Sequence, residues 1–144
     1  MAKIPLGIAN NNPLNIRYSP INKWKGQTGC NRGFCTFTSM KYGIRAALVL
    51  LRNYKKRGIV TLQDIISTWA PSIENDTKSY IKTVHGKLEE LLNRGIIGTD
   101  YRVRDMDIPY LAYCMSLVEC GSYAVQHAGI GLIDFTTVWE ELNP

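Results

Sequence analysis

Residues 39–58 read SMKYGIRAALVLLRNYKKRG, and this stretch decides the fold class. Its apolar side chains recur at helical spacing along one face, at Met40, Ile44, Ala47, Leu48, Leu51 and Tyr54. Ser39 is a suitable N-cap, and Gly58 is a suitable stop. The spacing therefore predicts an amphipathic helix that buries one face in a core.

The same periodicity continues towards the C-terminus, between capping residues and glycines or prolines that end each segment. It predicts four further helices, at residues 61–69, 75–95, 107–121 and 135–142. No internal repeat or long linker separates these segments. We therefore expect residues 1–144 to form one domain of mainly α (α+β) class.

The first 38 residues are instead punctuated by Gly, Pro and Asn, as in the run 10–13 and at Ser19-Pro20. Between these breaks lie short segments at 15–18 and 34–37 whose composition is typical of strands. The sequence thus predicts a small β-hairpin region ahead of the helices.

Charge is divided unevenly along the chain, whose net charge is +5. The first 57 residues contain eleven Lys and Arg but no Asp or Glu, and all twelve acidic residues lie from Asp64 onward. This asymmetry favours an anionic partner for the N-terminal half, although solvated basic helix faces would give the same pattern. We do not expect that partner to be nucleic acid, because no nucleic-acid-binding motif is present.

Several other classes of protein are disfavoured. No apolar run approaches the roughly 20 residues of a membrane span, and residues 1–7 do not resemble a signal peptide. We therefore expect synthesis in the cytoplasm, with delivery in a phage virion or to the cell envelope.

The cysteine pairs Cys30/Cys35 and Cys114/Cys120 lack zinc-site spacing, so neither metal nor cofactor is expected. A disulfide could form across the turn between Cys30 and Cys35, while reduced thiols are the default without an export signal.

Acid chemistry by a carboxyl group remains the most plausible catalytic chemistry. The chain contains no Gly-rich phosphate loop, no H-E-x-x-H and no G-x-S-x-G motif. Glu119 follows Met115 by four residues, which places it on the apolar face at the C-terminal end of its helix. Burial and the negative end of the helix dipole would both raise its pKa, as a general acid near neutrality requires. Exposure to solvent or pairing with an Arg is the alternative.

Glu74 is the second candidate for a catalytic carboxyl. It precedes a predicted helix start, where the helix dipole favours the ionised form, so it would suit a base or stabiliser better than an acid. A role in capping that helix is the simpler interpretation.

The N-terminal segment combines aromatic and amide side chains of the kind that bind sugars. Aromatic rings cover the apolar faces of sugars, while amide and guanidinium groups bond to hydroxyls. The candidate glycan-binding residues are Asn11, Asn12, Asn15, Arg17, Tyr18 and Trp24. Each one taken alone is equally compatible with an ordinary turn or core position.

Several of these segments together resemble a family. The run Gly7–Arg17 with its NNPxNIR pattern is followed by Trp24-x-Gly26, Phe34-x-x-Phe37, the WAPxxEN pattern at 69–75 and Glu119-x-Gly121. This order resembles small phage and prophage-type proteins described as virion structural proteins. The resemblance covers about residues 7–121 and departs from the pattern at Ala9 and Leu14.

The hairpin segment more loosely resembles lysozyme-like peptidoglycan glucosaminidases and lytic transglycosylases. In those enzymes the hairpin follows the helix that carries the catalytic Glu, whereas here nine residues precede it and none is acidic. Either a circular permutation has moved the acid to Glu119, or the acid was lost and the domain only binds glycan.

The resemblance implies a lysozyme-like helical domain, a monomer, that binds peptidoglycan or another cell-wall glycan. Its first expected function is a glycan-strand hydrolase or lytic transglycosylase with a Glu general acid. The alternative is a non-catalytic phage virion or cell-wall glycan-binding protein.

Overall fold

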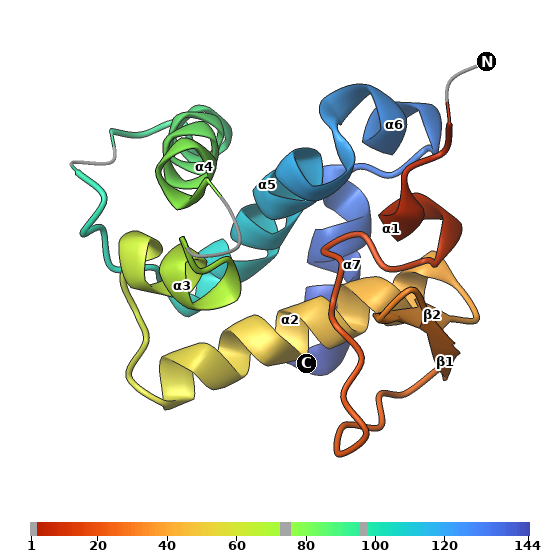
Figure 1. The fold of residues 1–144 in the computed structure, drawn as a ribbon. Coiled ribbons are helices and arrows are strands. Elements are labelled where there is room, and N and C mark those ends of the chain that lie inside the picture. The colour runs from red at the N-terminus through yellow and green to blue at the C-terminus, as the bar shows by residue number, and fades with distance from the viewer. Residues whose placement is uncertain (1–2, 73–75, 96–97) are drawn as a thin grey trace.

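The computed structural model describes residues 3–72, 76–95 and 98–144 (Figure 1). In that part of the chain helices predominate, and a small hairpin precedes most of them, so the expected fold class is confirmed. In chain order the elements are α1 (Leu6–Ala9), β1 (Gln27–Asn31), β2 (Phe34–Phe37), α2 (Met40–Lys56), α3 (Leu62–Trp69), α4 (Thr77–Leu92), the 3-10 helix η1 (Asp105–Asp107), α5 (Ile108–Cys120), α6 (Ser122–His127) and α7 (Leu132–Leu142).

The helices α2, α3, α4, α5 and α7 form what we call the helical body. Helix α5 lies against α2, α4 and α7, while α3 packs on α4 (Figure 1). Its core side chains have no exposed surface at Leu48, Leu111, Met115 and Phe135. Each buried aliphatic or aromatic side chain of this kind stabilises the fold by about 1.5–3 kcal/mol. The apolar stripes predicted from the sequence are therefore the stripes that pack.

Side chains cap the start of α3 and of α4, whereas the Ser39 side chain makes no capping hydrogen bond at the start of α2. The Thr61 side chain accepts a hydrogen bond from the Asp64 backbone N–H at 3.1 Å, and Asp76 accepts one from Ser79 N–H at 3.1 Å. The helix predicted to reach Gly95 ends earlier, at Leu92, because Asn93 adopts a left-handed conformation with φ of 51°. None of the helices within 3–72, 76–95 and 98–144 is both long and apolar enough to cross a bilayer.

Residues 3–38 form what we call the N-terminal lobe, which contains the hairpin. Strands β1 and β2 run antiparallel and are joined by Arg32 and Gly33, both with positive φ, at 52° and 86°. Such a two-residue turn matches the right-handed twist of the strands.

The strand predicted at 15–18 is wrong, because the true partner of β2 is Gln27–Asn31. Within the described residues, segment 15–18 contributes one bridge to β2, between Arg17 and Phe34. Asn15 has a φ of 52°, which is incompatible with extended strand geometry.

Two short helices were not predicted from the sequence. Helix α1 has four residues and α6 has six, too few for an apolar periodicity to show. Gly121, with φ of 87° and ψ of 141°, separates α6 from α5. Both short helices lie near the C-terminal end of α5 (Figure 1), which is where Glu119 is found.

Glycines mark several close approaches between the lobe and the helical body, among them Gly26, Gly43 and Gly7. A Cβ atom on Gly43 in α2 would lie 1.8 Å from the Asn11 carbonyl oxygen, so only glycine fits there. A Cβ atom on Gly7 in α1 would lie 2.6 Å from Cys120 Sγ, at the end of α5. These contacts hold the lobe beside Glu119.

Candidate functional site

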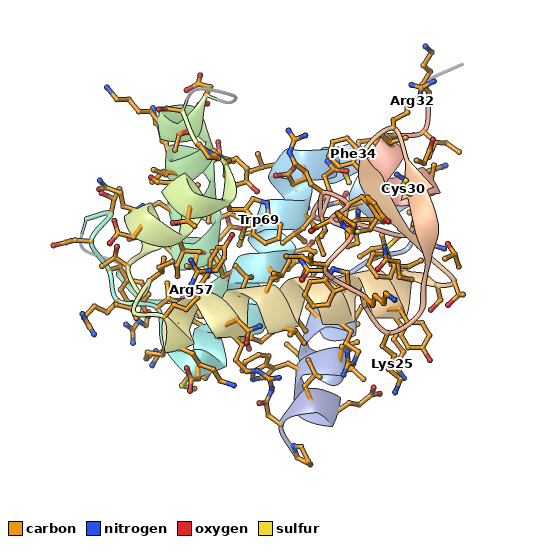
Figure 2. All side chains as sticks on the ribbon, turned by 60° about the horizontal axis from the view of Figure 1, so that its bottom comes forward. Lys25, Cys30, Arg32, Phe34, Arg57 and Trp69 are labelled. Carbon is orange, nitrogen blue, oxygen red and sulfur yellow. The ribbon has the colours of Figure 1, made fainter. Side chains whose placement is uncertain are left out.

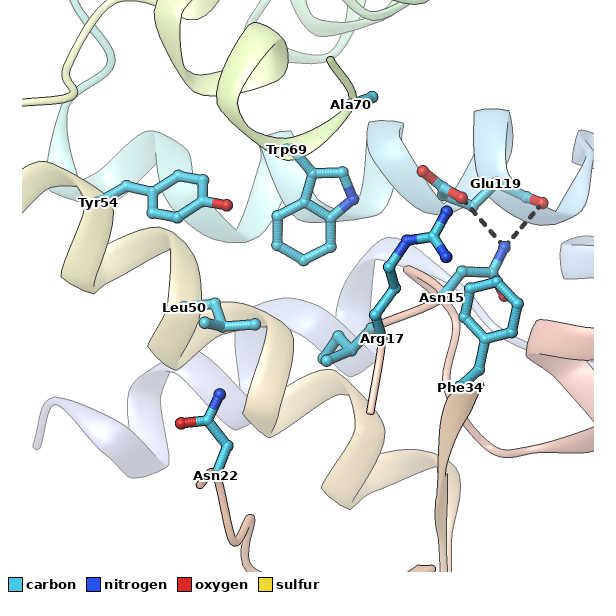
Figure 3. A pocket seen from close by; sticks show the side chains of 10 residues that line it. Asn15, Arg17, Asn22, Phe34, Leu50, Tyr54, Trp69, Ala70 and Glu119 are labelled. Atoms are coloured by element: carbon cyan, nitrogen blue, oxygen red, sulfur yellow. Dashed lines mark hydrogen bonds between the residues drawn. The ribbon is translucent and has the colours of Figure 1, made fainter. Parts of the chain in front are cut away.

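Glu119 lies half-buried in the last turn of α5, with its carboxylate beside the Asn15 amide (Figure 3). The Asn15 amide donates a 3.0 Å hydrogen bond to Glu119 Oε1, and the Tyr80 hydroxyl donates a 2.9 Å bond to Oε2. The donors come from the lobe and from α4, so three parts of the chain meet at one carboxyl group. Asn15 also donates to the Glu119 backbone carbonyl, at 3.4 Å.

The pKa of Glu119 is raised above its ordinary value. Burial is the main cause, because it disfavours the charged form. Hydrogen bonds from Asn15, Tyr80 and Trp69 and the positive charge of Arg17 act in the opposite direction but do not cancel it. Tyr80 is 6% exposed, and burial together with the negative charge of Glu119 raises its own pKa far above the usual value. Tyr80 therefore remains a neutral hydrogen-bond donor.

A pocket of about 310 Å³ opens beside Glu119 between the lobe, α2 and α3. Figure 3 shows its aromatic and basic lining, with Trp69 and Arg17 beside the carboxylate. The pocket is lined by Asn15, Ile16, Arg17, Asn22, Phe34, Leu50, Tyr54, Trp69, Ala70 and Glu119. We call it the lobe-side pocket. Aromatic surfaces beside amide and guanidinium groups suit a sugar ring with an acidic substituent.

A second pocket of about 290 Å³ lies on the other side of Glu119, against α4. Its lining residues are Asp76, Ser79, Tyr80, Thr83, Val118 and Glu119. We call it the α4-side pocket. Because Glu119 belongs to the lining of both pockets, an extended ligand that fills both would pass over this carboxyl group.

Two of the predicted glycan-binding residues lie at this site. Asn15 and Arg17 both line the lobe-side pocket, and the Arg17 guanidinium lies 5.4 Å from the centre of the Phe34 ring. This geometry is a cation–π contact, which fixes the direction of the guanidinium.

Tyr18 and Trp24 lie elsewhere, in a hollow of about 310 Å³ on the lobe. Tyr18 is 43% exposed, while Trp24 is half-buried and packs against the core. Asn22 lines both this hollow and the lobe-side pocket, so the two are neighbours.

Asn11 and Asn12 are structural residues in this arrangement. Asn12 is fully buried, and its amide donates 3.0 Å bonds to the carbonyls of Ile16 and Cys35, while its oxygen accepts a 2.9 Å bond from Ile16 N–H. Asn11 donates to the Phe37 carbonyl at 3.0 Å. Neither residue lines a pocket described above, so the prediction that they bind glycan is not supported by their positions.

Glu74, the second candidate carboxyl, lies outside the described residues. Among the described residues that line the two pockets, the carboxyl group besides Glu119 is that of Asp76. Its Oδ1 accepts the Ser79 N–H bond that caps α4. Asp76 therefore caps α4 and also lines the α4-side pocket.

The sequence did not identify Tyr80, Trp69 or Tyr54 as site residues. The sequence placed Tyr54 on the apolar face of its helix, and in the structure all three residues belong to the core or pack against it. The Tyr80 hydroxyl and the Trp69 side chain meet Glu119 only because α3, α4 and α5 converge. Periodicity within one helix does not indicate that convergence.

The described residues contain no cluster of three or more His, Cys, Asp or Glu that could hold a metal ion. Basic side chains are spread over both the lobe and α2 rather than gathered at the pockets. Figure 2 shows exposed Lys25 and Arg32 on the lobe and Arg57 at the far end of α2.

Comparison with known proteins identifies a phage relative. No protein-family model matches the chain. Over 121 residues, which cover 81% of this chain and 71% of its relative, it is 34% identical to Protein P5 of Pseudoalteromonas phage PM2. An identity of this size over most of both chains confirms the predicted phage affinity, and the chain belongs to the family of this phage protein.

Proposed function

We propose that this phage-family protein cleaves a bacterial cell-wall glycan strand and that Glu119 is its general acid. The observation that carries the proposal is the position of Glu119, a half-buried carboxyl with a raised pKa that lines two pockets. A general acid must keep its proton near neutral pH and must reach the bond that breaks. The described geometry supports both requirements.

The chemistry would proceed by proton transfer from Glu119 to the glycosidic oxygen of a strand lying across both pockets. As the bond breaks, the departing oxygen takes the proton, and positive charge develops on the neighbouring sugar ring. The new carboxylate would be stabilised where it forms, by the Asn15 amide and the Tyr80 hydroxyl. Burial favours the protonated form of Glu119 before the transfer, and the two hydrogen-bond donors stabilise the carboxylate after it.

The single acid between the pockets favours a lytic transglycosylase. In that reaction a hydroxyl group of the substrate itself attacks the cationic sugar and gives its proton to the Glu119 carboxylate. No second carboxylate has to activate water. Asp76 is the other described carboxyl of the pockets, and it already accepts the α4 capping bond. The aromatic rings of Trp69 and Tyr54 would cover the apolar face of a sugar in the lobe-side pocket.

A second candidate function is glycan binding without cleavage, as part of a phage virion. It is favoured by the relative, a phage protein whose name states no enzymatic activity. It is also favoured by the two donors on Glu119, because each oxygen already accepts a hydrogen bond and can serve as a fixed acceptor for a sugar hydroxyl.

The test compares wild type with Glu119→Gln on purified peptidoglycan. Glu140→Gln is the matched control, because it makes the same chemical change on an exposed face of α7. For an enzyme, wild type and the control release soluble fragments, and Glu119→Gln is slower by about 100-fold or more. Mass analysis of the new sugar ends then separates a transglycosylase, which leaves an anhydro end, from a hydrolase, which leaves a reducing end.

Co-sedimentation with the same peptidoglycan separates the two candidate functions. Binding by wild type with no release of fragments would reject the enzyme and support the glycan-binding protein. Release of fragments by Glu119→Gln at the wild-type rate would reject Glu119 as the acid. Absence of both release and binding would reject cell-wall glycan as the ligand.

A further inference from the structure

The hairpin of the lobe brings two cysteines opposite each other. Cys30 on β1 and Cys35 on β2 are register partners, one pair away from the Arg32-Gly33 turn. Directly opposed residues of an antiparallel pair project on the same face of the sheet. The two thiols therefore lie on one face, next to a turn that fixes the register.

This cysteine pair is of the non-hydrogen-bonded type. The Cys35 N–H donates to the Ile16 carbonyl at 2.9 Å, so it points out of the hairpin and not towards Cys30. Opposed residues of this type have Cα atoms about 4.5 Å apart, at the near end of the range of about 4.4–6.8 Å that disulfides span. A disulfide can therefore close with little movement of the strands.

The two thiols differ in access to solvent. Cys30 is exposed, whereas Cys35 is 1% exposed and its thiol lies 3.7 Å from the Arg17 carbonyl oxygen, to which it donates. Burial raises the pKa of the Cys35 thiol, and negative charge on Cys30 raises it further. An external reagent would therefore meet Cys30 first, and Cys35 would react only with Cys30 Sγ once that sulfur is part of a mixed disulfide.

We propose that Cys30 and Cys35 are a site of covalent modification, at which the chain forms a cross-strand disulfide by exchange with a low-molecular-weight disulfide. The Cys30 thiolate attacks one sulfur of that reagent, forms a mixed disulfide and releases one small thiol. The Cys35 thiolate then attacks Cys30 Sγ and releases the second small thiol. The two cysteines are oxidised, the reagent is reduced to two thiols, and the two protons of the cysteine thiols end on those products.

The bond would act on the lobe-side pocket without touching the carboxyl group. Phe34, next to Cys35 on β2, lines that pocket and contacts Arg17. Oxidation removes the thiol hydrogen that Cys35 shares with the Arg17 carbonyl, while it ties β2 to β1. The proposal does not depend on glycan cleavage, so it can fail or hold independently of the proposed function.

The remaining cysteines provide an internal comparison. Cys114 and Cys120 are both buried and lie six residues apart on one helix, which directs them to different faces. Burial raises their pKa values to about 12 and about 11, respectively, with the charge of Glu119 adding to the effect at Cys120. We expect neither to react in the folded protein.

Peptide mapping provides the test. Folded protein is incubated with oxidised glutathione, its remaining thiols are then alkylated in denaturant, and it is digested with trypsin without reduction. Trypsin cleaves after Lys25, Arg32 and Lys41, so Cys30 and Cys35 fall in separate peptides, 26–32 and 33–41. The expected product is these two peptides joined by a disulfide, which separate on reduction.

The variants assign the order of reaction. Cys35→Ser should stop at a glutathione adduct on Cys30, and Cys30→Ser, a change at an exposed position, should leave Cys35 unmodified. Cys114→Ala should still give the joined peptides. Wild type that accumulates the Cys30 adduct, or links Cys30 between two chains, without the joined peptides would overturn the proposal.

Thermal unfolding gives a second readout. A disulfide that closes so short a loop is expected to raise the Tm of oxidised wild type by roughly 5 °C over the reduced form. The same treatment should leave the Tm of Cys30→Ser unchanged. An equal shift in Cys30→Ser would contradict the assignment to this pair.

Discussion

The helical body and the N-terminal lobe differ in the side chains that stabilise each of them internally. The body is built on fully buried apolar side chains such as Leu48 and Phe135. The lobe also buries apolar residues such as Leu14, but in addition it contains a fully buried amide, that of Asn12, which pairs with the lobe backbone through three hydrogen bonds. Buried amides usually have their donors and acceptors paired, as those of Asn12 are. Consequently, polar residues in a turn-rich segment can be as structural as leucines in a helix.

This difference explains which residues reach the site. The body contributes Glu119 and Tyr80, while the lobe contributes Asn15 and Arg17. Asn15 is both an amide of the lobe and a residue of the site. Its Nδ2 donates to Glu119, while its Oδ1 is buried without a hydrogen-bond partner. The site is therefore formed where the two types of packing meet.

The largest effect is expected in the body, from Leu111→Ala. Leu111 lies in α5 with no exposed surface, so the change removes apolar contacts and leaves a cavity. The free energy of unfolding should fall by about 4 kcal/mol. Urea denaturation measures it, with Ile133→Ala as the control, because that side chain is 71% exposed. A loss below about 1 kcal/mol for Leu111→Ala would contradict an apolar core centred on α5.

The next effect tests the junction of the two regions, through Gly43→Ala. Alanine is normally better than glycine inside a helix by up to about 1 kcal/mol. Here its Cβ would meet the Asn11 carbonyl oxygen, and backbone must move, so we expect a net loss of about 3 kcal/mol.

Gly86→Ala is the matched control for that change. Gly86 lies in α4, and a Cβ there would have no neighbour within 4 Å. Its stability, measured by the same denaturation curve, should rise slightly. If both variants gained stability, the lobe would not rest on α2 as described.

The sequence predicted the body more completely than the lobe, for a physical reason. A helix with an apolar stripe, such as α2, is stable when that stripe faces the core. Its periodicity therefore identifies both the helix and the face that is buried. Segment 15–18 has the composition of a strand, but Asn15 turns the chain and β2 pairs instead with Gln27–Asn31. Such pairing depends on contacts between distant parts of the chain, which local composition does not encode.

A third and smaller effect tests the structural role of the lobe amides, through Asn12→Ala. The change removes the Asn12 partner of the Cys35 carbonyl and of the Ile16 N–H, while the Ile16 carbonyl keeps its bond from the Cys35 N–H. We expect the free energy of unfolding to fall by about 2 kcal/mol, because buried groups lose their hydrogen bonds. Asn22→Ala, at an exposed position of the lobe-side pocket, should leave stability unchanged. Equal stability of the two variants would contradict the distinction between them.

The candidate site was predictable in part. Glu119 was identified because its place on an apolar face at a helix end implies a raised pKa, and its pKa is raised by burial. The sequence does not distinguish the asparagines of the lobe, because the same amide side chain can bond to a sugar hydroxyl or to a backbone carbonyl. Only the fold separates Asn15, which lines the pocket, from Asn12, which does not.

The smallest effect is a pH dependence, and it tests whether the body imposes the raised pKa of Glu119. Because the pKa is higher in the folded chain than in the unfolded one, ionisation of Glu119 weakens the fold. Its contribution to stability is complete below the unfolded pKa and is lost as pH rises through the folded pKa.

The measurement is the free energy of unfolding of wild type and Glu119→Gln across that pH window. As pH rises, the free energy of unfolding of Glu119→Gln should increase relative to that of wild type, because glutamine does not ionise. This difference in free energy should level off above the folded pKa. Glutamine also weakens the bond from Tyr80, but that loss is independent of pH in this range, since Tyr80 stays protonated. The slope of this difference against pH therefore reports the ionisation of Glu119 alone.

Glu140→Gln is the control, because Glu140 is exposed, and its free energy of unfolding should differ from that of wild type by the same amount at every pH. An opposite slope for Glu119→Gln would mean that the Asn15 and Tyr80 hydrogen bonds outweigh burial, which would favour an ionised acceptor for bound glycan over a general acid.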